Sequence, residues 1–304
     1  MAPMSVPTLA PSVVTSRDPK GVKFLSIVAA AYDKARLPED EAQLVNEAAG
    51  LAEIVASHIE KNRRPNLYPD EEVRTSYSYP RGYTGPKPIA DQIKAIAEIF
   101  GLDPASAMTF VKSLPAHPEG TEGWFAIPSV DALAAKHFPE VTDPAEKYCR
   151  AVQLVHQKIA KSRPFYNWRD GQIDAAHLRV SARTSEAMDR IAEQQKGDIL
   201  IVAVQLGKHH GGRSVRRARG LFANNEFGLT SVAVGAIILV HPERIACYEE
   251  LDIDCSGDEF SDAGGDVFGH APYFSFYDDE VKFVTLVVSS ASAYYGSASG
   301  FAPQ

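Results

Sequence analysis

The fold is decided by the stretch ILIVAVQL at residues 199–206 and by GKHHGGRS, which follows directly at residues 207–214. An almost unbroken run of aliphatic residues predicts a strand that is buried on both faces. The glycines that follow interrupt the strand, and Ser214 is a residue type that favours the position just before a helix. The sequence therefore predicts a strand, a glycine-rich loop and a helix over residues 214–222.

The loop matches the phosphate-cradling spacing G-x-x-x-x-G-K-[ST], with arginine in place of lysine. Gly207 and Gly212 would let main-chain N–H groups converge on an anion. Ser214 would cap a helix whose N-terminus is positive, and Arg213 would donate to two phosphate oxygens. Arginine is bulkier than lysine, and no clear strand ending in a Mg²⁺-binding aspartate accompanies the loop. The pattern predicts a phosphate or anion site, and the alternative is a strand-to-helix turn without a ligand.

Positive charge is concentrated around this loop. Residues 208–219 contain no acid and five basic side chains: Lys208, Arg213, Arg216, Arg217 and Arg219. On a helix, Arg216 and Arg219 lie one turn apart and Arg217 lies nearby, a stripe that suits the phosphates of nucleic acid or of a nucleotide. The alternative is a solvated helix face whose arginines pair with acids of the same chain.

Residues 249–266 carry eight acids and no basic residue, as many acids as the whole net charge of -8. Residues 252–257 match the first six positions of an EF-hand loop, but its twelfth position is Ala263 instead of glutamate, which excludes that motif. Asp254, Asp258 and Glu259 are the candidates for a looser Mg²⁺ or Ca²⁺ site. The alternative is an acidic turn that neutralises the arginines.

Other site classes have no support in the sequence. The three cysteines have unrelated spacings, which excludes a disulfide framework and a Cys-x-x-Cys motif. Neither a His-Glu-x-x-His motif nor a Gly-x-Ser-x-Gly motif occurs, although His209 and His210 in the loop could supply a base or metal ligands. Because there is neither a signal-like start nor an apolar run of membrane-spanning length, we expect a cytoplasmic protein without a membrane partner.

The periodicity predicts an α+β protein: a helix-rich N-terminal part, then a mixed α/β part with the buried strand and a C-terminal β-hairpin at residues 272–288. We expect a mobile tail at residues 1–19, a mainly helical region at 20–165 and a mixed region at 166–304, the last two of which can be one continuous domain. One helix is expected over residues 38–61 and a long tyrosine-containing loop over 62–87.

Three functions follow from these features. The leading hypothesis is a protein that binds nucleic acid or a nucleotide through the loop and its arginines. The second is a metal-dependent phosphodiester hydrolase, in which the acids hold Mg²⁺ or Ca²⁺. The third is a non-catalytic assembly protein, a homo-oligomer whose oppositely charged segments pair between copies. The sequence does not decide whether the chain is an enzyme.

Overall fold

The computed structural model describes residues 15–62, 66–248 and 250–302, and the chain divides into two compact units at residues 1–65 and 66–304. The first unit contains α1 (Pro19–Ala35), α2 (Glu39–Glu47) and α3 (Leu51–Asn62). The single helix predicted over residues 38–61 is wrong, because the chain leaves the helix at Ala48 and turns through Gly50 at a φ of 97°. Most of the predicted tail, residues 1–14, lies outside the described residues.

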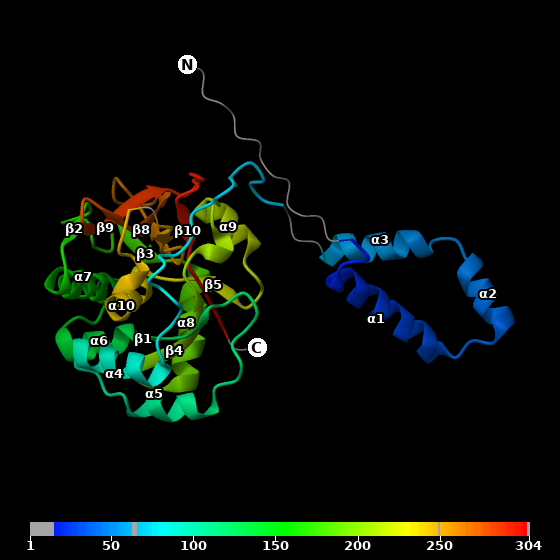
Figure 1. Cartoon of the computed structure of the whole chain (residues 1–304), viewed down its shortest axis with the longest axis horizontal. Helices are drawn as coiled ribbons and strands as arrows, with labels where there is room; N and C mark the ends of the chain where they lie inside the picture. Colours follow the sequence, from blue (N-terminus) through cyan, green and yellow to red (C-terminus); the bar gives the residue numbers. More distant parts are fainter. Residues whose placement is uncertain (1–14, 63–65, 249, 303–304) are drawn as a thin grey trace, which may run out of the picture. The chain divides into compact units, whose positions relative to one another are not determined.

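A four-stranded antiparallel sheet contains the stretch that decides the fold (Figure 1). Its strands lie in the order β1 (Gly123–Pro128), β4 (Ile199–Gln205), β11 (Ser299–Phe301) and β5 (Glu226–Gly228). Every residue of β4 is buried, which confirms the predicted strand. The continuous apolar pattern arises because β4 is an inner strand of an antiparallel sheet that is covered on both faces.

A seven-stranded sheet forms the second layer of strands. β10 (Tyr295–Ser297), β6 (Asp252–Asp254), β8 (His270–Tyr277), β7 (Asp258–Phe260) and β3 (Leu178–Val180) follow one another, while β9 (Glu280–Val287) pairs with β8 and with β2 (Phe165–Asn167). The hairpin β8–β9 confirms the prediction for residues 272–288. Its two turn residues, Asp278 and Asp279, have φ values of 55° and 60°, as a tight turn between twisted strands requires.

Seven α-helices of the second unit pack with these sheets: α4 (Ile89–Phe100), α5 (Ala105–Phe110), α6 (Val130–His137), α7 (Pro144–Ser162), α8 (Ala182–Gln195), α9 (Val215–Leu221) and α10 (Ser231–Val240). α10 contacts β1 of one sheet and β8 of the other, and nine of its ten residues are buried. A helix that is apolar all round is typical of such a central position. The α+β class is confirmed, and no helix among the described residues is long and apolar enough to span a membrane.

Candidate functional site

The glycine-rich loop joins β4 to α9, and its glycines lie where other segments approach closely. Gly207 has a φ of 113°, and a Cβ there would lie 2.6 Å from the carbonyl oxygen of Gly296. Gly212 has a φ of 81°, and a Cβ there would overlap the carbonyl oxygen of Val73. Both glycines are therefore required by packing of the loop against its own chain.

The start of α9 is covered by residues 66–73, which we call the covering segment. Ser214 caps the helix, since its hydroxyl accepts a hydrogen bond from the amide of Arg217. The Ser214 amide donates to the Glu71 carbonyl at 3.1 Å, and the Ser214 hydroxyl donates to the Glu71 carboxylate at 2.6 Å. Glu71 thus accepts hydrogen bonds from the amide and the hydroxyl of Ser214, at the position where the sequence pattern predicts a bound anion.

Three of the predicted arginines also contact the covering segment. Arg213 and Arg217 lie 3.0 and 3.4 Å from the carboxylate of Glu72. Arg216 pairs with Glu71, which lowers the pKa of that carboxyl and raises the pKa of the guanidinium. Glu71 and Glu72 were not singled out from the sequence, because nothing in a loop about 140 residues upstream marks them as partners of this helix.

Within the described part of the chain, Arg219 is the one of these arginines that reaches the acidic segment. Its guanidinium donates to the carbonyls of Ser256 and Asp258 at 2.9 and 2.6 Å, and it lies 3.8 Å from the carboxylate of Glu259. The basic loop and the acidic segment therefore meet at this one arginine, while Arg213, Arg216 and Arg217 pair with other acids.

The three acids predicted for Mg²⁺ or Ca²⁺ are engaged separately. Asp258 is fully buried and accepts hydrogen bonds from the Tyr148 hydroxyl and the Ser231 amide. Asp254 is buried beside the Ser297 hydroxyl, and Glu259 pairs with an arginine of β3 at 2.8 Å. Burial raises the pKa of Asp254 to about 7 and that of Asp258 to about 6, and the charge of Arg219 limits both increases.

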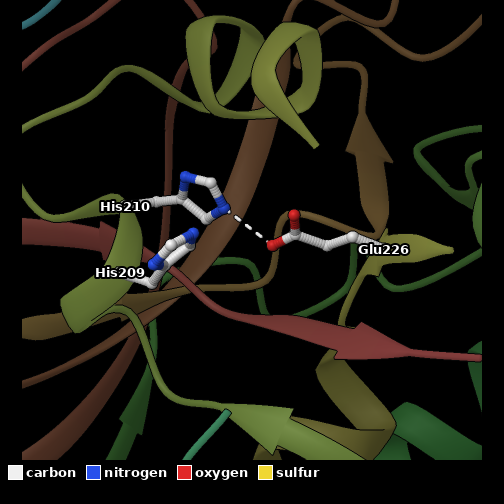
Figure 2. Close-up of side chains that lie close together, drawn as sticks. All are labelled: His209, His210 and Glu226. Carbon is white, nitrogen blue, oxygen red and sulfur yellow. Dashed lines mark hydrogen bonds and ion pairs between the residues drawn. The ribbon is translucent and has the colours of Figure 1, made fainter. Parts of the chain in front are cut away.

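A different group of possible metal ligands lies at the loop (Figure 2). Among the described residues, His209, His210 and Glu226 are the one set of three or more His, Cys, Asp or Glu side chains whose ligand atoms all lie within 4.8 Å of one another. Glu226 stands on β5, which joins the sheet beside β11. His209 and His210 could be proposed as ligands from the sequence because they lie in the glycine-rich loop, but no sequence motif contains Glu226.

Hydrogen bonds hold Glu226 and His210 in the interior, where each is at most 2% exposed. The Glu226 carboxylate accepts from the Ser299 hydroxyl at 2.6 Å and from the Ala223 amide at 2.8 Å, and its oxygen lies 2.8 Å from His210 Nε2. Burial alone would raise the pKa of Glu226, but His210 and these donors outweigh it, so that the pKa lies below its usual value.

The contact with Arg213 determines which tautomer of His210 fits its surroundings. Its Nη1 lies 3.0 Å from His210 Nδ1, and a guanidinium can only donate, so Nδ1 accepts and Nε2 carries the proton toward Glu226. Two imidazoles and a carboxylate form a donor set typical of zinc. Comparisons with protein-family models, with curated proteins and with solved structures found no match to this chain.

Proposed function

We propose that the chain binds one divalent transition-metal ion, zinc by the chemistry of the donors, through His209, His210 and Glu226. The convergence of these three ligand atoms within 4.8 Å carries the proposal. His210 and Glu226 are held in a buried environment by the surrounding chain, whereas His209 is exposed and leaves the cluster open on its side. Glu226 is ionised, which is the state that a metal requires.

A small movement opens the cluster for zinc. His210 Nε2 and the Glu226 oxygen are 2.8 Å apart, whereas tetrahedral zinc ligands are separated by about 3.3 Å. His210 must also move its proton from Nε2 to Nδ1, because the metal takes the Nε2 lone pair. Arg213 then has to turn from Nδ1, and it keeps Glu72 as its partner.

Three protein ligands would leave a fourth position for water, the arrangement of catalytic rather than structural zinc. A metal held by these residues would lower the pKa of its water to about 7 and would supply hydroxide for hydrolysis. The metal-dependent hydrolase expected from the sequence is therefore proposed with these ligands in place of Asp254, Asp258 and Glu259. Phosphodiesters are the substrate class, since Arg213 lies on the same loop and Arg216 and Arg217 lie on α9, which follows it.

Zinc titration of the full chain by calorimetry tests the site. We expect one equivalent to bind, and His209→Ala to weaken binding by about 100-fold, since losing one of three ligands removes a coordinate bond. His117→Ala is the matched control, because His117 is also exposed and lies outside the cluster. Arg213→Met is expected to tighten zinc binding about tenfold, since it removes the donor that competes for His210.

The proposal is wrong if zinc binds equally to wild type and to His209→Ala, or if no binding is measured in Arg213→Met. A thermal melt of each variant without metal shows that the comparison is made on folded protein.

A phosphate-bearing ligand is the second candidate, favoured by an imbalance of charge beside the loop. Arg213, Arg216 and Arg217 share two carboxylates, those of Glu71 and Glu72. The Arg216 side chain is 39% exposed, and its guanidinium lies 4.3 Å from the centre of the Tyr68 ring. One net positive charge with an accessible guanidinium suits a phosphate group.

Pyrophosphate and a single-stranded oligonucleotide are the probes for this candidate. At low salt we expect weak binding that falls as salt is added, and a loss of about tenfold in Arg216→Gln. Arg150→Gln is the control, because Arg150 is another surface arginine paired with one acid. If Arg216→Gln and Arg150→Gln bound these probes with equal affinity, Arg216 would not contribute to phosphate binding.

A further inference from the structure

The outer face of the seven-stranded sheet carries an aromatic and acidic hollow of about 590 Å³. Side chains alternate along a strand, so Tyr273, Ser275 and Tyr277 of β8 lie on the face opposite to the fully buried Phe274. The pairing of strands extends this face, since Ser275 stands opposite Lys282, and Tyr273 opposite Val284. The hollow is thus built on a regular sheet.

Two more strands complete the floor. β10 runs parallel to β6 with Tyr295 opposite Asp252, and both residues line the hollow. The rings of Tyr273 and Tyr295 lie 4.9 Å apart, which joins the two sides of the floor. The floor therefore offers tyrosine rings and hydroxyls around one carboxyl group.

Exposed aromatic rings surround this floor. Six tyrosine and tryptophan side chains are exposed in the described part of residues 66–302, and four of them line the hollow: Trp168, Tyr248, Tyr277 and Tyr294. Tyr248 and Tyr277 lie with their ring centres 5.4 Å apart. Exposed rings gathered at a hollow, rather than scattered over the surface, indicate a binding site.

The charge of the hollow is negative. Its lining includes the carboxyls of Glu250, Asp252 and Asp278 and one amine, Lys282. Lys282 is already paired with Asp278 and with Glu280, at 3.6 and 3.3 Å. In the described part of the chain no side-chain hydrogen bond or ion pair is seen for Asp252. Burial, together with the charges of Asp254 and Glu250, raises its pKa to about 8, although the charge of Arg244 opposes the increase.

Lys282 also shows that this surface accepts a cation over a ring. Its amine lies 5.0 Å from the centre of the Tyr277 ring, in the geometry of a cation–π contact. We propose that the hollow between Trp168, Asp252 and Tyr277 binds a small organic cation of the alkylammonium class, with the aromatic rings around its methyl groups and the carboxyls of Asp252 and Glu250 beside its charge. This ligand site is separate from the zinc proposal and does not depend on it.

Two other occupants are distinguished by charge and by size. A neutral sugar would stack on the rings and form hydrogen bonds with the hydroxyls, but the negative charge of the carboxyls would not favour its binding. A second copy of the chain would cover the exposed rings, and would make the hollow inaccessible at high protein concentration. The negative lining and the lysine already held over a ring favour the cation.

Choline and its neutral isostere 3,3-dimethylbutan-1-ol are the probes, titrated against the full chain in low salt at pH 8.5, which lies above the pKa of Asp252. Saturation-transfer NMR and the fluorescence of Trp168 report binding. We expect choline to bind at least about tenfold more tightly than the isostere, as for a cation in a desolvated aromatic site. Asp252→Asn should weaken choline about tenfold and Trp168→Ala about fivefold, because charge and ring contribute separately.

Asp279→Asn is the matched control. It removes the same charge from the same sheet, and Asp279 is exposed at the hairpin turn and does not line the hollow. Equal affinity for choline and the isostere, or equal losses in Asp252→Asn and Asp279→Asn, would overturn the proposal. Binding of glucose or cellobiose in place of choline would also overturn it, as would dimerisation at titration concentrations that is abolished by Trp168→Ala. A zinc chelator should leave choline binding unchanged.

Discussion

Replacing Gly212 with alanine should lower the free energy of unfolding by about 3 kcal/mol. A left-handed φ costs about 1 kcal/mol for alanine, and forcing a methyl group into packed surroundings costs about 1–3 kcal/mol. The φ of Gly212 is 81°, and the added Cβ would overlap the carbonyl oxygen of Val73. The overlap is not easily relieved, because the Val73 amide donates to the Gly212 carbonyl at 2.8 Å.

Gly171→Ala is the control for this substitution. Gly171 has nearly the same φ, 76°, but nothing lies within 4 Å of the position of its Cβ. Gly171→Ala should lower the free energy of unfolding by about 1 kcal/mol, because only the left-handed backbone conformation is unfavourable for alanine there. Urea denaturation of both variants measures the difference. If Gly212→Ala were no less stable than Gly171→Ala, the glycine would not be required by packing, and the phosphate-loop hypothesis would gain support.

Replacing Glu72 with glutamine should cost about 2–3 kcal/mol of stability. The side chain of Arg217 is 5% exposed and lies 3.4 Å from the Glu72 carboxylate, which is 27% exposed. Removing one partner of a buried ion pair costs about 3–5 kcal/mol, and partial exposure of this pair to solvent reduces the loss. Arg217 keeps Asn66 and the Leu67 carbonyl as acceptors, so the guanidinium loses its counter-charge and retains its other hydrogen bonds.

The control for Glu72→Gln is Asp70→Asn. Asp70 belongs to the same covering segment and is exposed, so the same change of charge should cost at most about 0.5 kcal/mol. Urea denaturation at low and high salt measures both variants. If Glu72→Gln lost no more stability than Asp70→Asn, or if its loss of stability disappeared at high salt, the ion pair of Glu72 with Arg217 would be a weak surface contact.

Much of the fold follows from local pattern. Ser129, Asp143 and Ser214 are residue types that favour the position just before a helix, and each caps a helix there with a side chain that accepts from a main-chain amide. In residues 230–240 the alanine and glycine content favours a helix and the valine and isoleucine content favours a strand, and the sequence prediction is a helix. The helix is realised because Thr230 caps it and because it is buried between elements of both sheets, where β-branched residues are tolerated.

The site depended on contacts that no local pattern encodes. Glu71 and Glu72 reach α9 from about 140 residues away, and Glu226 meets His210 through the pairing of β5 with β11. The arginines could be found by their density in the sequence, but their partners could not. The sequence predicted the hairpin that contains Tyr273, Ser275 and Tyr277, but only the fold brings Asp252 and Trp168 beside them.

Crystals of the full chain soaked in zinc, with diffraction recorded on both sides of the zinc absorption edge, show whether zinc binds at His209, His210 and Glu226. We expect an anomalous peak at about 2.0–2.2 Å from the ligand atoms of His209, His210 and Glu226, with Arg213 turned away from His210. The contradicting result is a zinc-soaked crystal in which that position has no peak and Arg213 still donates to His210.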